Sequence, residues 1–117
     1  MTRHEPQPRP EAAFGDAGRQ LAQLREVLRL VEAVAGRPSA SGAPEGPLDE
    51  AARVAAAYGD ALPIVQRRFD ALVAETVAWA AAGVDALSRA GGPRPAAARL
   101  ADELDRALED LLALLKP

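Results

Sequence analysis

Cysteine is absent from this 117-residue sequence, and His4 is its single histidine. Without cysteine the chain cannot form a disulfide framework, a thiolate-bound zinc or iron–sulfur site, or a thiol nucleophile. One histidine cannot supply a multi-histidine metal site, and it lies in a proline-rich stretch where a Ser-His-Asp triad is not expected. We therefore expect no cofactor, no metal and no catalysis.

Aromatic residues are also scarce, at 3% of the chain, although 49% of its residues are hydrophobic. The hydrophobic total includes 28 alanines, which leaves 29 bulkier apolar residues, 15 of them leucine. A core built from so few large side chains is thin for a chain of this length. Burial of further surface against another molecule would therefore add to its stability.

Positive charge is not in excess, because the chain has 14 basic and 17 acidic residues and a net charge of −3. This balance is not that of a nucleic-acid-binding protein, so we expect no nucleic-acid partner. The first ten residues contain three prolines and no apolar run, which is not the pattern of a secretory signal peptide. The longest apolar segment carries Glu75 and Asp85, so we expect no membrane span and a cytoplasmic location.

The chain divides into a proline-rich segment, residues 1–15, and a region of helical periodicity, residues 16–117. We expect the first to be a disordered tail and the second to be a single domain. Its helices are predicted at about 16–36, 48–59, 61–90 and 95–115.

The segment 16–36 has apolar residues at alternating spacings of three and four, which is typical of one face of a helix. These residues are Leu21, Leu24, Leu28, Val31 and Ala35, and the stripe is widened by Val27, Leu30 and Val34. Asp16 is a suitable N-cap, and Gly36 followed by Pro38 is a suitable end for the helix.

Residues 37–47 contain three prolines, two glycines and two serines, and predict a loop. Pro47 suits the first position of the next helix. Further on, Gly59 and Pro63 interrupt the helical pattern. Either one helix kinks there, or a new helix begins with Asp60 as its N-cap; we favour a short helix, a corner and a long helix.

The long helix, 61–90, is apolar on nearly every side. Its bulky face carries Leu62, Val65, Phe69, Leu72, Val73, Thr76, Ala80, Val84 and Leu87. Its opposite face carries Ile64, Arg67, Ala71, Ala74, Ala78, Ala82 and Asp85. Such a helix is either the central helix of the fold or is covered by a second copy of the chain.

A Gly91-Gly92-Pro93 turn precedes the last helix, in which leucines recur along one side. We find no strand pattern and no internal repeat. The predicted fold is all-α: an antiparallel up-and-down helical bundle of three main helices plus one short helix before the Gly59/Pro63 corner.

The function that these patterns favour is a small helical protein-interaction module, such as an adaptor, small chaperone or regulatory subunit. Its interaction residues are predicted to be Ala71, Ala74, Ala78, Ala82 and Trp79, because small side chains let another helix approach closely. The partner is another protein or a second copy, which makes a homodimer a hypothesis.

Two alternatives remain open from the sequence. The first is a bundle that binds a small apolar ligand between its helices, near Phe69, Thr76 and Trp79. The second, less favoured, is a small enzyme that uses the acidic residues of the last helix. These are Asp102, Glu103, Asp105, Glu109 and Asp110, and the arginines among them indicate a solvated face instead.

Overall fold

The computed structural model describes residues 15–38 and 46–116, and in this part of the chain it contains helices and no strand. The helices are α1 (Gly15–Val34), α2 (Pro47–Asp60), α3 (Pro63–Arg89) and α4 (Arg94–Leu114). The prediction of an all-α bundle with three main helices and one short helix is confirmed. The predicted tail, residues 1–15, lies outside the described residues except for Gly15.

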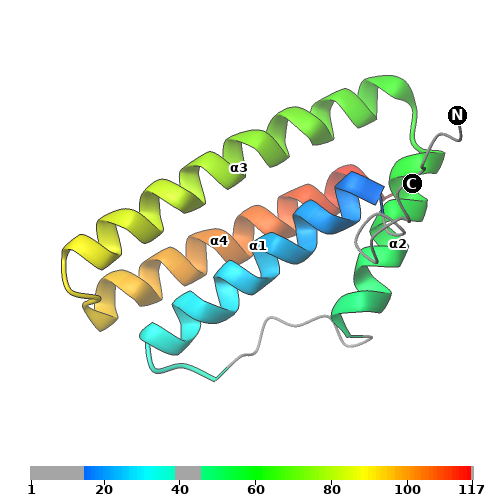
Figure 1. The fold of residues 1–117 in the computed structure, drawn as a ribbon. Coiled ribbons are helices and arrows are strands. Elements are labelled where there is room, and N and C mark those ends of the chain that lie inside the picture. The colour runs from blue at the N-terminus through cyan, green and yellow to red at the C-terminus, as the bar shows by residue number, and fades with distance from the viewer. Residues whose placement is uncertain (1–14, 39–45, 117) are drawn as a thin grey trace, which may run out of the picture.

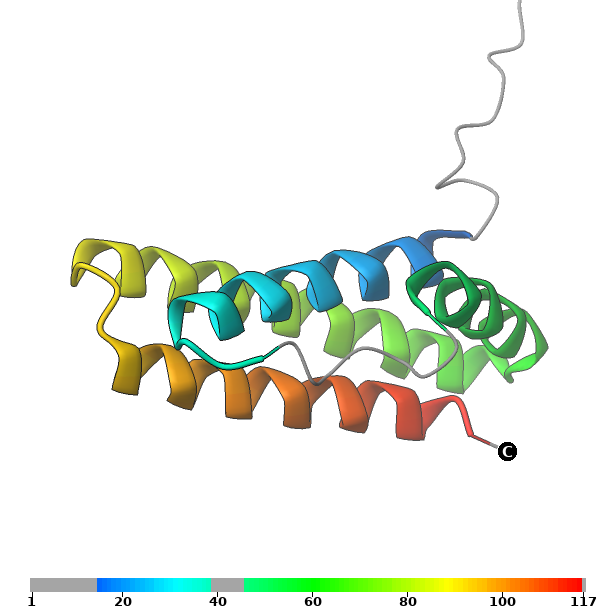
Figure 2. The same ribbon diagram turned by 90° about the horizontal axis from the view of Figure 1, so that it is seen from below.

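The three long helices lie side by side, and the shorter α2 is inclined across the end where α1 begins (Figures 1 and 2). α1 and α3 run in the same direction, and α4 runs antiparallel to both. The return of the chain through the loop and α2 makes the first and third helices parallel. α1 packs against each of the other three helices, so it is the central one. Of the two alternatives stated for the long helix, the central position is therefore wrong, and its covering by a second copy stays a prediction.

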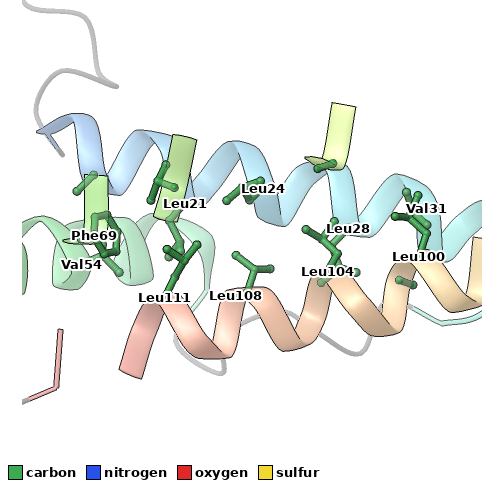
Figure 3. Close-up of a cluster of buried hydrophobic side chains, with 14 of the residues drawn as sticks. Leu21, Leu24, Leu28, Val31, Val54, Phe69, Leu100, Leu104, Leu108 and Leu111 are labelled. Carbon is green, nitrogen blue, oxygen red and sulfur yellow. The ribbon is translucent and has the colours of Figure 1, made fainter. Parts of the chain in front are cut away.

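The core lies between α1 and α4, with smaller contributions from α2 and α3. Figure 3 shows the leucines of α1 directly facing those of α4. Its largest fully buried side chains are Leu21, Leu24, Leu28, Leu104, Leu108, Leu111, Phe69, Val54 and Val73. The Phe69 ring packs edge-on against Tyr58, with the ring centres 5.7 Å apart. The apolar stripe predicted for the first helix is thus the stripe that is buried.

Glycine ends both α1 and α3 through the same motif. Gly36 and Gly91 have φ of 71° and 82°, a left-handed conformation that side chains disfavour. The Gly92 amide donates to the Leu87 carbonyl at 2.9 Å, and the Arg37 amide donates to the Glu32 carbonyl at 2.9 Å. These six-residue closures are Schellman motifs, which satisfy the last carbonyls of a helix. Both predicted helix ends are confirmed.

The corner between α2 and α3 separates two helices, as we favoured. α2 ends at Asp60, Ala61 and Leu62 are extended, and α3 begins at Pro63. The expectation that Asp60 is the N-cap is wrong, because Leu62 takes that position without a side-chain hydrogen bond. A cap at Asp60 would need an amide from Leu62 or Pro63, and proline has none. Asp16 likewise lies inside the first turn of α1.

A buried ion pair fixes α2 against α1. The Arg25 guanidinium donates two hydrogen bonds to the Glu50 carboxylate, each 2.9 Å long. The side chains of Arg25 and Glu50 are only 14% and 4% exposed. Because both groups are desolvated, each depends on the other for stabilisation. The pair therefore acts together with the buried side chains of Ala51 and Val54 to hold the inclined helix in place.

We expect Glu50→Gln to lower the free energy of unfolding by about 3 kcal/mol, because it leaves a buried guanidinium opposite a neutral amide. Urea denaturation followed by circular dichroism measures this change. The exposed Asp85–Arg89 pair provides the control, since Asp85→Asn should cost less than about 0.5 kcal/mol. Equal losses for the two variants would contradict the special role of the buried pair.

Two glycines within helices, Gly59 of α2 and Gly83 of α3, should respond differently to alanine. A Cβ at Gly59 would meet nothing within 4 Å, whereas one at Gly83 would lie 2.8 Å from Cδ1 of Leu100. Gly59→Ala should therefore stabilise the fold by about 0.5–1 kcal/mol. Gly83→Ala should give less, because Leu100 must move to make room for the methyl group. Thermal and urea unfolding of the two variants compare them, and a larger gain at Gly83 would refute the close approach of α3 and α4.

Candidate functional site

α3 is buried along one narrow stripe and is exposed on its other sides. The buried residues of this helix are Phe69, Val73, Thr76, Ala80 and Leu87. The four alanines predicted to form an interaction face are Ala71, Ala74, Ala78 and Ala82, and all four are exposed. The predicted face is thus at the surface, available to another molecule.

Large hydrophobic side chains are also exposed, and they are concentrated between α1 and α3. Seven of these side chains are exposed among the described residues: Leu30, Val34, Leu62, Ile64, Val77, Trp79 and Val84. Leu30 and Val34 belong to α1 and are 60% and 43% exposed, while Val77 and Val84 of α3 are 40% and 38% exposed. All four border hollows that α1 and α3 form together. An exposed apolar cluster of this kind is typical of an interaction site.

These hollows form one groove. The larger has a volume of about 710 Å³ and the smaller about 370 Å³, and both are lined by Val27, Val84 and Ser88. The smaller continues along the helices to the Gly91-Gly92 turn. We call this surface the α1–α3 groove. Its lining residues are Gln23, Leu24, Glu26, Val27, Leu30, Val31, Val34, Val77, Ala80, Ala81, Val84, Asp85, Leu87, Ser88, Gly91 and Gly92.

Each side of the α1–α3 groove presents a row of residues at heptad spacing. The row on α1 is Gln23, Val27, Leu30 and Val34, and the row on α3 is Val77, Ala81, Val84 and Ser88. Both rows have successive spacings of four, three and four residues. Side chains at this spacing form the holes into which the knobs of a further helix pack. The groove therefore has the geometry of a helix-binding surface.

Each bank of the groove carries one acid, Glu26 on α1 and Asp85 on α3, and each acid is ion-paired with a base on its own helix. Arg29 contacts Glu26 at 3.1 Å, and Arg89 contacts Asp85 at 2.9 Å. All four side chains are largely exposed, so each pair adds little to stability. An apolar floor with a charged rim is the usual composition of a protein interface.

None of the five predicted interaction residues, Ala71, Ala74, Ala78, Trp79 and Ala82, lines the α1–α3 groove. On the α1 side, the sequence pattern of Val27, Leu30 and Val34 was taken only to widen the stripe of the first helix. The signal that could have identified it is the regularity of these residues. They repeat at spacings of three and four beside a stripe that already buries one face of α1. An amphipathic helix in a small bundle needs one such row, and a second row requires a second neighbour.

Of the three residues predicted to line a ligand pocket, Thr76 and Trp79 share a hollow and Phe69 does not. Phe69 is fully buried in the core. The Thr76 hydroxyl donates to the Leu72 carbonyl at 2.7 Å, a bond within its own helix. Thr76 and Trp79 line a surface hollow of about 250 Å³ on the α4 side of α3, and its other residues are Leu72, Glu75, Glu103 and Ala107.

Another hollow, of about 410 Å³, lies where α1, α2 and α3 meet, and its lining is more polar than that of the α1–α3 groove. Its lining residues are Asp16, Ala17, Gln20, Ala55, Tyr58 and Asp70. The Tyr58 hydroxyl lies 2.9 and 3.0 Å from the two carboxylate oxygens of Asp70, to which it donates. This hydrogen bond, followed by burial and by the charges of Asp70 and Asp16, raises the pKa of Tyr58 above its ordinary value of 10.0.

Carboxylates do not converge elsewhere in the described part of the chain. Residues 15–38 and 46–116 contain no group of three or more histidine, aspartate or glutamate side chains that could hold a metal ion. On α4, Asp102, Glu103, Glu109 and Asp110 are exposed, and Asp102 accepts a hydrogen bond from Arg37 at 2.9 Å. These groups form a solvated face.

One helix of the described residues, α3, is long and apolar enough to cross a membrane by length and composition alone. Most of that helix is exposed, so its apolar character is not explained by burial in the core. Comparison of the chain with protein-family models, with curated proteins and with solved structures gives no match. The candidate site therefore rests on its own geometry.

Tyr58 is the single tyrosine of the chain, so phenolate absorbance reports its ionisation alone. We expect it to titrate above pH 10.0 in the folded protein and to return toward 10.0 in Asp70→Asn. Because the folded pKa is raised, the related stabilisation is complete below pH 10 and is lost as the pH rises through the folded value. Asp85→Asn is the control and should leave the titration unchanged, whereas an unshifted Tyr58 in the parent protein would contradict the hydrogen bond.

Proposed function

We propose that this protein is a helical protein-interaction module, such as an adaptor, small chaperone or regulatory subunit, and that its docking surface is the α1–α3 groove. The observation that carries the proposal is the gathering of Leu30, Val34, Val77 and Val84 along one groove. Isolated exposed hydrophobic residues are normal on a protein surface, but four along one groove are a feature of docking sites. Catalysis is not part of this proposal.

Helix-in-groove binding is the mode that this surface supports. Each row spans 11 residue steps, which is about 17 Å or three helical turns. A guest helix of that length presents apolar anchors at positions i, i+3 or i+4, and i+7. The two rows offer matching holes for such anchors. The apolar floor supplies the driving force, and the rim charges supply orientation.

A membrane is a less suitable partner for α3 than a protein. Residues 71–84, which include only the charge of Glu75, extend about 21 Å, and the hydrocarbon core of a bilayer is about 30 Å thick. Arg67, Asp70 and Asp85 lie just outside that stretch. We therefore place the interaction module in the cytoplasm as part of the proposal.

A small apolar ligand is supported less well by the geometry. Pockets for such ligands usually measure about 300–1,000 Å³ and enclose most of the ligand. The hollow beside Trp79 measures about 250 Å³ and excludes Phe69, which had been expected to line it. The α1–α3 groove is large enough, but it is a long channel between two helices and suits an elongated partner.

Leu30→Glu should abolish partner binding without unfolding the protein, because it places a charge on the apolar floor at a residue that is already exposed. Ile64→Glu is the matched control, since Ile64 is similarly exposed, at 55%, and lies outside the groove. Capture of proteins from extracts of the source cells compares the two variants with the parent protein. Proteins lost with Leu30→Glu and kept with Ile64→Glu support the proposal. A captured set that is the same for all three would refute it.

A further inference from the structure

We propose that the α1–α3 groove binds a second copy of the same chain, turned end for end, so that α1 packs antiparallel on α1 and α3 on α3. This inference rests on the proposed function, because it names the partner of the same groove. It is carried by the order of charges on the two banks, together with the parallel arrangement of α1 and α3 (Figure 1).

Both banks carry an acid followed by a base in the same direction along the chain. Glu26 precedes Arg29 on α1, and Asp85 precedes Arg89 on α3. Since the two helices are parallel, both acids lie toward one end of the groove and both bases toward the other. The order of charges along the groove, acid at one end and base at the other, is therefore the same on its two sides.

A copy turned end for end matches every charge with its opposite. Glu26 of one copy faces Arg29 of the other, and Asp85 faces Arg89, with each contact made twice by symmetry. In the parallel two-fold arrangement α1 would lie on α3 of the other copy. Glu26 would then face Asp85, and Arg29 would face Arg89, which is repulsive on both banks. Charge complementarity therefore favours the antiparallel copy.

A single two-fold axis can pair the charges on both sides of the groove. The midpoint between Glu26 and Arg29 lies beside Val27, and the midpoint between Asp85 and Arg89 is Leu87. Val27 lines both hollows together with Val84 and Ser88, which lie on either side of Leu87 along α3, so the two midpoints lie at a similar level of the groove. A single two-fold axis near these residues brings Leu30 and Val84 of the two copies together. The apolar floors and the rim charges are thus matched by the same rotation.

The alanines of α3 help this packing. Ala74 and Ala78 are exposed and lie next to Val77 and Ala81 on the surface of the helix. Small side chains there let two copies of α3 approach closely, which is the contact that the sequence predicted for them. The matched footprint is about 17 Å long and two helices wide, about 20 Å, or about 340 Å² on each copy, which is below the size of stable interfaces and suits a weak dimer. We therefore expect a dimer with a dissociation constant in the micromolar range.

A charge-exchange experiment tests the arrangement. Sedimentation velocity over a dilution series should show the parent chain passing from 12.2 kDa toward twice that mass as concentration rises. Glu26→Arg and Arg29→Glu alone each create two like-charge contacts in the dimer. Each should raise the dissociation constant about tenfold or more. An equimolar mixture of the two variants restores opposite charges at both contacts, so it should form a heterodimer about as tight as the parent dimer.

Two further variants complete the test. The double variant Glu26→Arg/Arg29→Glu exchanges both charges within one chain and should dimerise like the parent, which shows that the single variants act through pairing. Leu30→Glu should abolish the dimer, while Ile64→Glu should not. Circular dichroism melting should be nearly the same for all variants, because the exposed Glu26–Arg29 pair contributes little to folding.

The outcomes separate this inference from the proposed function. A parent chain that stays monomeric throughout the micromolar range overturns the inference, and the proposed function then still stands if Leu30→Glu loses a captured partner. A dimer that resists Glu26→Arg but is lost with Leu30→Glu overturns the antiparallel arrangement alone. A dimer that survives Leu30→Glu excludes the groove as its interface and overturns the inference.

Discussion

Leucine packing between α1 and α4 is the interaction on which the rest of the structure depends. The two helices bring most of the large fully buried side chains, and they face each other along their whole shared length (Figure 3). This one seam holds six of the nine largest fully buried side chains: Leu21, Leu24, Leu28, Leu104, Leu108 and Leu111. α2 and α3 then attach to the seam by different means. α2 is held through the Arg25–Glu50 pair and the buried Ala51 and Val54, and α3 is held through a single narrow stripe.

The narrow attachment of α3 explains why a groove exists at all. Its stripe includes Thr76 and Ala80, and Gly83 lets it approach Leu100 of α4 closely. α3 thus lies tight against α4 while its contact with α1 is the sparsest among the three long helices. The apolar residues that face this opening on α1 and α3 are left exposed. A tighter α1–α3 contact would have buried Val77 and Val84 and removed the surface.

Periodicity and end signals were sufficient to predict the helices, the Schellman glycines and the buried face of α1, because these depend on neighbours in the chain. They were not sufficient to predict which helix is central. A helix that is apolar on nearly every side can be buried on several sides or exposed on several sides. α3 is exposed on most of its sides. The Arg25–Glu50 pair was also not predicted, since it joins residues 25 positions apart. The predicted alanine face is exposed but does not line the groove, and the groove itself could not be predicted without knowing which helix lies beside α3.

The separation in sequence of α1 and α4 has a consequence for how the chain comes to be folded. α1 is synthesised before the other described helices and α4 after them, yet each buries its leucines mainly against the other. Until α4 has been made, the leucine stripe of α1 has no proper cover. In the growing chain, the apolar face of α1 therefore stays exposed while α2 and α3 are synthesised. The stripe that is exposed at that stage is buried in the finished fold, so the unfinished chain offers other apolar surfaces a contact that the folded protein does not.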